Sequence, residues 1–326
     1  MKILAFEVRE DEKLYFKKYA DKYNCEITLT EAPLNFETLP MANGYDGVSI
    51  LGKSHLTADI EDNLKASKVN FCSTRTVGFN HIDIEHAHKI GLKVANSNYP
   101  PTGVAEHTVM LILMSLRNYK QAMWRGQVND YSLSGLKGRE LNSLTVGIIG
   151  TGKIGQCVIK NLFGFGCKIL ACDKYENDEI KKYATYTDLD TLITSSDIIS
   201  LHTPLLESTY HLINDEKINK MKDNVILINC ARGELMDINA LIYGVESKKI
   251  GALGLDVIEG EDGLYHEDKR SDIISNQKIA YLRQFPNVIL TQHMAFYTDT
   301  AVENMVKCSI EAIHDFVKKG DCPTSI

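Results

Sequence analysis

Short apolar runs recur along almost the whole chain and are separated by longer amphipathic stretches. Most runs are continuously apolar and do not alternate with polar residues, which is the pattern of parallel strands covered on both faces. We predict strands at residues 2–6, 47–51, 69–73, 92–96, 145–150, 168–172, 197–201, 225–229, 251–256 and 287–291. The longest predicted helices are 102–119 and 299–319.

Alternation of strand and helix predicts an α/β protein with parallel sheets. The 326 residues suit two domains, and the pattern falls into a first unit up to residue 98 and a second from 99 to 298. We therefore expect two doubly wound parallel-sheet domains. The last helix follows the last strand and is polar on one face, and the pattern alone leaves open which unit it packs against.

Composition excludes several classes of protein. The net charge of −7 comes without a cluster of positive residues, so binding of nucleic acid through phosphates is not expected. The most apolar helical stretch, 104–116, is shorter than the ~20 residues of a membrane span, and the first apolar run is too short for a signal peptide. Eight scattered cysteines without a CxxC pair indicate reduced thiols of a cytoplasmic protein, and the sequence shows no metal-ligand spacing.

A glycine-rich turn follows the predicted strand at 145–150. Gly150, Gly152 and Gly155 form GxGxxG, a helix comes next, and Asp173 ends the following strand. In this context the glycines permit a tight turn, close approach of a pyrophosphate and close helix packing, and the helix N-terminus attracts the phosphates. Asp173 would accept hydrogen bonds from a ribose. The sequence therefore predicts an NAD-type dinucleotide site.

Polar residues also follow several later strands, at the sheet edge where ligands bind in open α/β folds. Reduction of a 2-oxo acid needs an arginine for the carboxylate, an imidazolium to donate a proton, and a carboxylate to orient that imidazole. Arg232 and His293 supply the first two residue types. Two alternatives stay open, because spacing does not rank Glu259 against Glu261, and His202, His107, His81 and His55 compete with His293.

At this point the sequence resembles the D-isomer-specific 2-hydroxyacid dehydrogenase family over essentially its full length. Within that family it is most similar to D-lactate dehydrogenases of the vancomycin-resistance type. The matching segments are TRTVGFNHID (74–83), YPPTGVAEHTVMLIL (99–113), TVGIIGTGKIG (145–155), DIISLHTPL (197–205), INCARGELMD (228–237), LGLDVIEGE (253–261) and TQHMAFYT (291–298).

The resemblance implies a role for each candidate residue. Arg232 would hold the substrate carboxylate and carbonyl, His293 would donate the proton, and Glu261 would pair with His293. The substrate would also meet the backbone N–H groups of Val77 and Gly78, and the side chain of Tyr99. The implied cofactor contacts are Gly150, Gly152, Lys153, Ile154, Gly155, Asp173, Thr203, Pro204, Thr209, Cys230, Ala231, Arg232 and Asp256.

The resemblance also implies the architecture. A flavodoxin-like substrate domain would comprise residues 1–98 plus 299–326, and a Rossmann NAD-binding domain would comprise 99–298 and form a homodimer. The final helix would then return to the first domain. Two departures from the family are Gln292, where proline commonly precedes the catalytic histidine, and Lys174, directly after the ribose-binding acid.

The implied activity is reduction of pyruvate to D-lactate with NADH. Related substrates are the alternatives within the same chemistry: the oxo acids of 2-hydroxyglutarate, 2-hydroxyisocaproate or an aryl-lactate. Loops 51–55 and 294–298, which set substrate size, do not point to one of them. An alternative of a different class is a dimeric interaction protein that senses NAD(H), although no interaction tail supports it.

Overall fold

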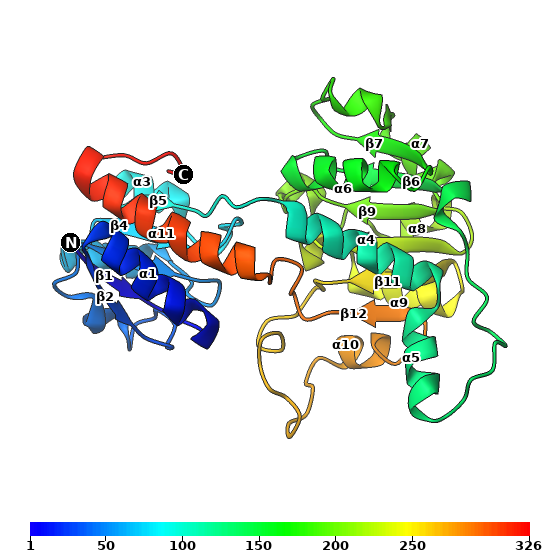
Figure 1. Ribbon diagram of the computed structural model, residues 1–326, viewed down its shortest axis with the longest axis horizontal. Coiled ribbons are helices and arrows are strands. Elements are labelled where there is room, and N and C mark those ends of the chain that lie inside the picture. The colour runs from blue at the N-terminus through cyan, green and yellow to red at the C-terminus, as the bar shows by residue number, and fades with distance from the viewer. The chain divides into compact units, whose positions relative to one another are not determined.

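A computed structural model describes all 326 residues of the chain (Figure 1). The chain divides into two compact units, Met1–Pro100 with Tyr297–Ile326, and Pro101–Phe296. The boundaries predicted from the sequence, 98/99 and 298/299, lie two residues from these divisions. We describe each unit by itself.

The first unit is built on a five-stranded parallel sheet in the order β2-β1-β3-β4-β5. This is the flavodoxin-like order 2-1-3-4-5, so the expected fold of this unit is confirmed. Its strands are β1 Lys2–Ala5, β2 Glu26–Leu29, β3 Gly47–Ile50, β4 Phe71–Thr74 and β5 Lys93–Ala95. Its α-helices are α1 Lys13–Tyr23, α2 Ala58–Ala66, α3 Ile84–Ile90 and α11 Asp299–Lys319, with 3₁₀ turns η1 Glu10–Glu12 and η2 Leu39–Ala42.

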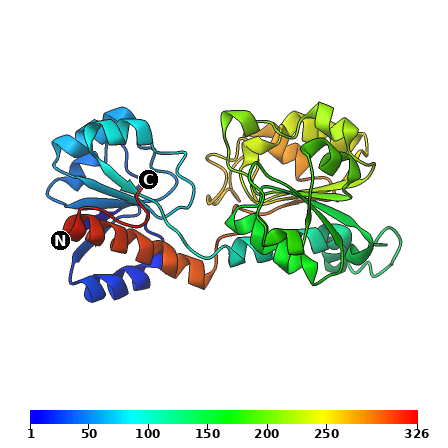
Figure 2. The ribbon, with the colours of Figure 1, turned by 90° about the horizontal axis from the view of Figure 1, so that it is seen from above.

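The C-terminal helix α11 belongs to the first unit. Its apolar side chains Val306, Ile310 and Ile313 share one core cluster with Ile3 and Phe16. Helices α1 and α11 lie side by side on one face of the sheet, and α2 and α3 cover the other (Figure 2). The helix therefore returns to the first unit, as the family resemblance implies.

The second unit has a seven-stranded parallel sheet in the order β12-β11-β10-β9-β6-β7-β8. The strand order reverses beside β6, which is the Rossmann arrangement expected from the sequence. Its strands are β6 Thr145–Ile149, β7 Lys168–Cys172, β8 Thr185–Tyr186, β9 Ile198–Leu201, β10 Val225–Asn229, β11 Ile250–Leu255 and β12 Val288–Leu290. Its helices are α4 Thr102–Leu116, α5 Tyr119–Gln127, α6 Lys153–Phe163, α7 Leu189–Ser195, α8 Asp215–Lys220, α9 Ile238–Glu246 and α10 Gln277–Leu282, with 3₁₀ turns η3 Leu141–Ser143, η4 Ile180–Lys182, η5 Glu207–Thr209 and η6 Gly233–Leu235.

Helices cover both faces of this sheet (Figure 2). One core cluster holds the buried side chains of α4 and α6, and the other holds those of α7 to α10. The strands β9 and β10 at the centre of the sheet are buried at every position, which explains the apolar run VILI of β10. None of the helices of the structure combines the length and apolar character needed to cross a membrane.

Three local predictions were wrong or incomplete. The predicted helix 102–119 ends at Leu116, because Asn118 takes a left-handed backbone conformation with φ of 50° and a second helix, α5, starts after it. The edge strands β2 and β8 were not predicted. Their sequences, EITL and TY, are short and only partly buried, so they lack the apolar run that marks the central strands.

Helix α2 carries an acidic side chain inside the first unit. Glu61 is completely buried, and neither carboxylate oxygen has a hydrogen-bond partner. Burial, reinforced by the nearby charge of Asp83, raises the pKa of Glu61 to about 7 from its ordinary 4.5. The folded protein therefore holds this proton more tightly than the unfolded chain does.

Glu61 should make the first unit less stable as pH rises. Its contribution to stability is fully present below pH 4.5 and is lost as pH increases through about 7. Glu61→Gln keeps the shape without the charge, so the variant should melt at a higher temperature than wild type at pH 8 and show little difference at pH 4.5. Thermal melts across that range measure this, with Glu85→Gln on the exposed face of α3 as control. Equal melting temperatures at pH 8 would contradict the assignment.

Candidate active site

The glycine-rich turn between β6 and α6 forms a cradle open on one side. Gly150 has a φ of +94°, and a Cβ there would lie 2.6 Å from the backbone of His202, so only glycine fits. A Cβ on Gly155 would lie 2.0 Å from the Gly150 carbonyl oxygen, which shows how closely α6 packs on the turn. A Cβ on Gly152 would meet no atom within 4 Å, and Gly152 provides no side-chain cap to α6. The cradle therefore fits the pyrophosphate of a dinucleotide at a helix N-terminus.

Asp173 follows β7 and closes the cradle. Its Oδ2 accepts hydrogen bonds from the backbone N–H of Thr151 at 2.5 Å and from the Thr151 hydroxyl at 3.1 Å, and its Oδ1 accepts from the N–H of Tyr175 at 3.0 Å. Partial burial alone would raise the pKa of Asp173, but these hydrogen bonds outweigh burial and lower it. The carboxylate is therefore ionised at neutral pH, beside the turn where a ribose would lie.

His202 does not suit the role of proton donor. Desolvation lowers the pKa of this half-buried histidine to about 4, so its ring is neutral at neutral pH. Its Nε2 lies 2.9 Å from the Ser200 hydroxyl, within the sheet edge beneath the glycine turn. The following residues Thr203 and Pro204 form the loop after β9, in which Thr209 donates to the Pro204 carbonyl at 2.7 Å.

The loop after β10 carries the candidate arginine. The buried Asn229 accepts from the Ala231 N–H at 2.9 Å and donates to the Arg232 carbonyl at 2.8 Å, which fixes the loop backbone. The Arg232 side chain is half-buried and donates one hydrogen bond to the Ala231 carbonyl at 2.7 Å. Burial raises the pKa of the Cys230 thiol to about 12, so this cysteine is not a nucleophile.

The structure distinguishes the two candidate glutamates. Glu261 Oε1 lies 2.6 Å from His293 Nδ1, and its Oε2 accepts from the Ile258 N–H at 2.7 Å. Glu259 points elsewhere, with its Oε1 2.8 Å from His211 Nε2. Of the two, Glu261 is therefore the carboxylate that contacts the His293 ring.

Asp256 holds the loop that carries His293. Its carboxylate accepts from the Thr291 hydroxyl at 2.5 Å and from the N–H groups of Met294 at 2.9 Å and Ala295 at 2.8 Å, and its carbonyl accepts from the His293 N–H at 2.8 Å. Burial would raise the pKa of Asp256, but these bonds and the nearby His107 lower it to about 2.

This network adds residues that sequence reasoning did not assign. His107 Nε2 lies 3.1 Å from the Thr291 hydroxyl and 3.4 Å from the Asp256 carboxylate, so it supports the loop from α4 and is not free to donate a proton to a substrate. His293 itself has a φ of 51°, a left-handed conformation that costs a histidine energy and that the Asp256 hydrogen bonds maintain. The only sequence signal for His107 was its place as a polar residue within the apolar start of α4, in the segment YPPTGVAEHT (99–108).

In the first unit the candidate substrate loop follows β4. Val77 is 43% exposed, and the carbonyls of Val77 and Gly78 accept side-chain hydrogen bonds, whereas neither N–H group acts as a donor. The loop is anchored by the fully buried Arg75, which donates to the Glu12 carboxylate at 2.9 Å and to the Ser49 hydroxyl at 2.9 Å. The half-buried Tyr99 lies in the same unit, between β5 and Pro100.

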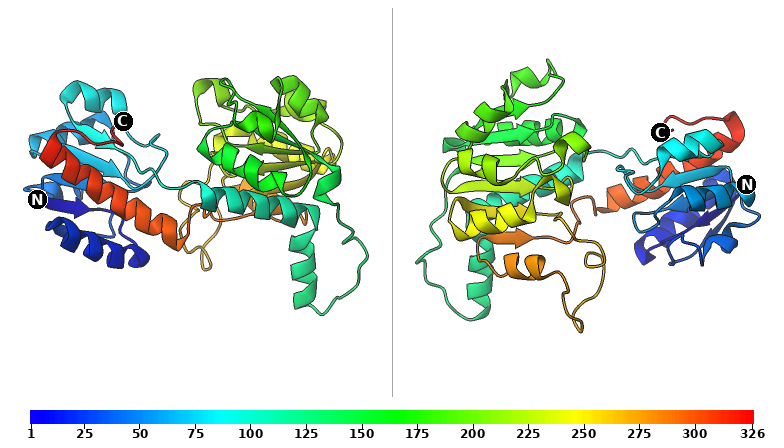
Figure 3. Two further views of the ribbon diagram at one scale, coloured as in Figure 1. Left: turned by 45° about the horizontal axis from the view of Figure 1, so that its top comes forward. Right: turned by 180° about the vertical axis from the view of Figure 1, so that it is seen from behind.

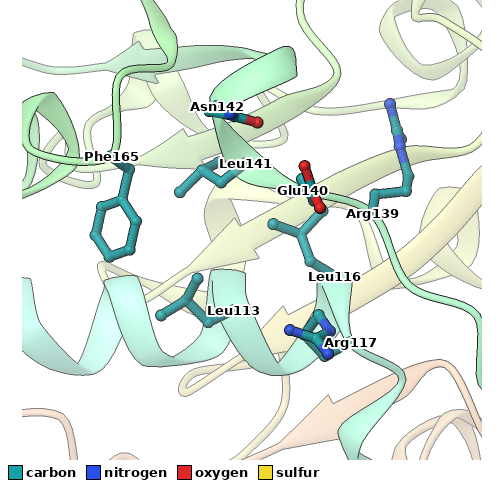
Figure 4. A pocket seen from close by; sticks show the side chains of 8 residues that line it. All are labelled: Leu113, Leu116, Arg117, Arg139, Glu140, Leu141, Asn142 and Phe165. Carbon is teal, nitrogen blue, oxygen red and sulfur yellow. The ribbon is translucent and has the colours of Figure 1, made fainter.

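A separate hollow of about 350 Å³ lies near the amino ends of β6 and β7 (Figure 4). It is lined by Leu113, Leu116, Arg117, Arg139, Glu140, Leu141, Asn142 and Phe165. The glycine turn, Arg232 and His293 all follow the carboxyl ends of their strands, so the hollow is on the opposite edge of the sheet and is not part of the candidate site.

Comparison with known proteins agrees with this geometry. The family model "D-isomer specific 2-hydroxyacid dehydrogenase, NAD binding domain" matches residues 109–295. An aromatic 2-oxoacid reductase of Clostridium sporogenes is 42% identical over 99% of this chain and 98% of its own, and a D-lactate dehydrogenase of Lactobacillus delbrueckii is 37% identical over 100% and 98%. The structure of a D-2-hydroxyisocaproate dehydrogenase superposes with a TM-score of 0.90 at 34% identity, over 100% of this chain and 99% of that one. The chain therefore belongs to the D-isomer specific 2-hydroxyacid dehydrogenases, NAD-dependent oxidoreductases that act on the CH–OH group of D-2-hydroxy acids.

Proposed function

We propose that this protein uses NADH to reduce a small 2-oxo acid to the D-2-hydroxy acid, with His293 as the proton donor. The observation that carries the proposal is the 2.6 Å contact between His293 Nδ1 and Glu261 Oε1. The carboxylate occupies Nδ1, which leaves Nε2 available to the substrate carbonyl.

Each residue then has a defined task. The Arg232 guanidinium of the second unit binds the substrate carboxylate. In the first unit, the family resemblance supports the N–H groups of Val77 and Gly78 and the side chain of Tyr99 as further substrate contacts. The nicotinamide supplies hydride to the carbonyl carbon when NADH is bound. As charge develops on the carbonyl oxygen, His293 donates the Nε2 proton, and Glu261 stabilises the imidazolium until that moment.

The cofactor would be held by two groups of residues in the second unit. The glycine turn and the start of α6 contribute Gly150, Gly152, Lys153, Ile154, Gly155 and Asp173. The loops after β9, β10 and β11 contribute Thr203, Pro204, Thr209, Cys230, Ala231, Arg232 and Asp256. All of them follow carboxyl ends of strands or the switch beside β6, where this fold binds dinucleotides.

Pyruvate and an aromatic 2-oxo acid are the two leading substrates. The motifs that resemble D-lactate dehydrogenases support pyruvate, whereas the relatives at 42% identity are aromatic 2-oxoacid reductases. The loops that we propose to set substrate size carry apolar side chains, Leu51 in the first unit and Met294, which is 39% exposed, in the second, and this suits an apolar substrate group.

We further propose a cytoplasmic homodimer formed through the second unit. All eight cysteines are free, as in a reducing compartment. Helix α5 and the loop after it project from the body of that unit (Figure 3) and carry exposed apolar side chains, among them Trp124 at 64% and Leu133 at 85%. Exposed apolar groups of this size favour a surface that binds a second copy of the chain. Sedimentation of the purified protein tests the proposal, and a monomer would contradict it.

Initial rates with NADH test the substrate and its stereochemistry. We expect turnover with pyruvate, phenylpyruvate or 4-methyl-2-oxopentanoate, and only D product, because Arg232 and His293 would fix which face of the carbonyl receives hydride. Chiral chromatography identifies the product. L-hydroxy acid would refute the proposed geometry, and a higher rate with 2-oxoglutarate would require a cationic partner for its second carboxylate. Binding of a protein partner that depends on NADH, without turnover of any 2-oxo acid, would favour the alternative of an interaction protein that senses NAD(H).

Asp173 should make the enzyme prefer NADH to NADPH. Its charge opposes a ribose 2′-phosphate, which carries nearly two negative charges. Asp173→Asn removes the charge but keeps an oxygen for the Thr151 N–H, so the ratio of kcat/KM values for NADH and NADPH should fall toward one. Lys174→Ala is the contrasting variant at the next position: it removes a cation that would attract the 2′-phosphate, so this ratio should not fall. Equal use of both cofactors by wild type would show that Asp173 does not discriminate.

The His293–Glu261 pair should set the pH dependence of the reaction. Reduction needs imidazolium and should fall on the alkaline side, whereas oxidation needs neutral imidazole and should rise there. His293→Ala should lower kcat by ~10²–10⁴-fold with NADH affinity unchanged. Glu261→Gln should cost less and move the alkaline fall of reduction to lower pH. Near-normal turnover of the alanine variant, or an unshifted profile of the glutamine variant, would exclude the respective residue.

A further inference from the structure

The turn that carries Glu261 is closed by two hydrogen bonds between Glu261 and the backbone of Ile258. Glu261 Oε2 accepts from the Ile258 N–H at 2.7 Å, and the Glu261 N–H donates to the Ile258 carbonyl at 3.2 Å. The position of Glu261 against His293 is therefore set by the position of residues 258 and 259.

One face of this segment rests on the arginine loop. A Cβ on Gly233 would lie 2.3 Å from the Ile258 carbonyl carbon and 2.4 Å from the Glu259 nitrogen. The two backbones are thus in direct contact, directly after Arg232 in one and just before Glu261 in the other. Contact on one face alone would still allow the turn to move away from the arginine loop.

The Glu259 side chain anchors the same segment. Its Oε1 lies 2.8 Å from His211 Nε2 and accepts from the Tyr210 hydroxyl at 3.4 Å, and its Oε2 accepts from the Ile238 N–H at 3.2 Å. Ile238 is the first residue of α9, where a carboxylate is favoured by the helix N-terminus. Glu259 therefore ties the turn both to the η5 loop and to α9.

His211 is itself fixed between two carboxylates. Its ring Nδ1 lies 3.9 Å from Asp237 Oδ2, and the Tyr210 ring stacks on the His211 ring with centroids 4.0 Å apart. The backbone N–H of His211 donates to the Glu234 carbonyl at 2.9 Å. His211, Asp237 and Glu259 bring ligand-capable atoms within 4.8 Å of one another. However, the two ring nitrogens face different carboxylates, which is the geometry of a bridging imidazole and not of a shared cation.

We propose that Glu259 and His211 are positioning residues that hold Glu261 against His293. The proposal deepens the proposed function, since it rests on His293 as the proton donor. Neither residue touches the His293 ring. Their loss would let the 258–261 turn move, and a displacement of about 1 Å can cost as much as 10²-fold in rate.

Four variants test the proposal in the full-length protein. Glu259→Ala should lower kcat about 10- to 100-fold, leave KM for NADH unchanged, and move the alkaline fall of reduction to lower pH, as is expected of Glu261→Gln. Glu259→Gln keeps one acceptor oxygen for the Ile238 N–H and an amide N–H that can donate to His211 Nε2, so it should restore most of kcat. His211→Asn, chosen because asparagine tolerates the φ of 48°, should resemble Glu259→Ala, and the double variant should be no worse than the poorer single variant.

Asp62→Asn is the matched control. Asp62 Oδ1 lies 2.9 Å from His86 Nε2, a carboxylate–imidazole pair of similar length on α2 and α3 of the first unit. Its loss should leave kcat and the pH profile unchanged. A Glu259→Ala variant with kcat within twofold of wild type, or one whose lower kcat comes with an unshifted pH profile and no rescue by glutamine, overturns the positioning role.

A cofactor-free measurement separates this proposal from the proposed function. The His293 ring resonance can be followed by NMR as pH is varied, without substrate or turnover. If wild type reduces no 2-oxo acid, the proposed function fails, yet a lower titration midpoint of His293 in Glu259→Ala still supports the positioning role. An unchanged midpoint overturns it whatever the activity.

Discussion

The candidate site depends on one buried carboxylate. Asp256 ends β11, and it accepts hydrogen bonds from the segment that follows β12 while its own carbonyl accepts from His293. An ionised group that is 1% exposed is stable only when its hydrogen-bonding capacity is filled, so the loop must keep the conformation that fills it. That requirement maintains the left-handed backbone of His293. The same strand end leads directly into the Glu261 turn, so His293 and its carboxylate partner Glu261, 32 residues apart, are held by the end of a single strand.

Much of the fold was predictable because burial on both faces leaves a strong mark in the sequence. The strands β9 and β10 are buried at every position and mostly apolar, and Gly150 and Gly155 of the cradle occur where a Cβ would strike backbone. The edge strands β2 and β8 escaped prediction because none of their residues is fully buried. The break between α4 and α5 depends on the backbone of a single asparagine, which the apolar pattern does not report.

The sequence predicted which residue types form the candidate site, but not the direction in which each side chain points. Spacing alone could not separate Glu259 from Glu261, since two residues in a turn can point either way, and here they point to different histidines. The resemblance to the family implied that Glu261 pairs with His293, but it gave no reason in terms of side-chain positions. His202 is disfavoured as the proton donor because desolvation lowers its pKa, and desolvation depends on the packing around the ring, which the sequence does not report. Substrate size depends on loops whose sequences carry little physical signal, so one fold serves lactate, isocaproate and aromatic acids among its relatives.

The return of α11 to the first unit also governs the order in which the chain can fold during synthesis. Residues 101–296 are continuous, so the second unit can complete its core as soon as they have emerged from the ribosome. The first unit emerges earlier but lacks Val306, Ile310 and Ile313, which cover Ile3 and Phe16. The part of the sheet face that α11 covers therefore stays exposed until residues 299–319 have been made. The segment made first is completed last, and for most of its synthesis the nascent chain presents an apolar surface that chaperones can bind.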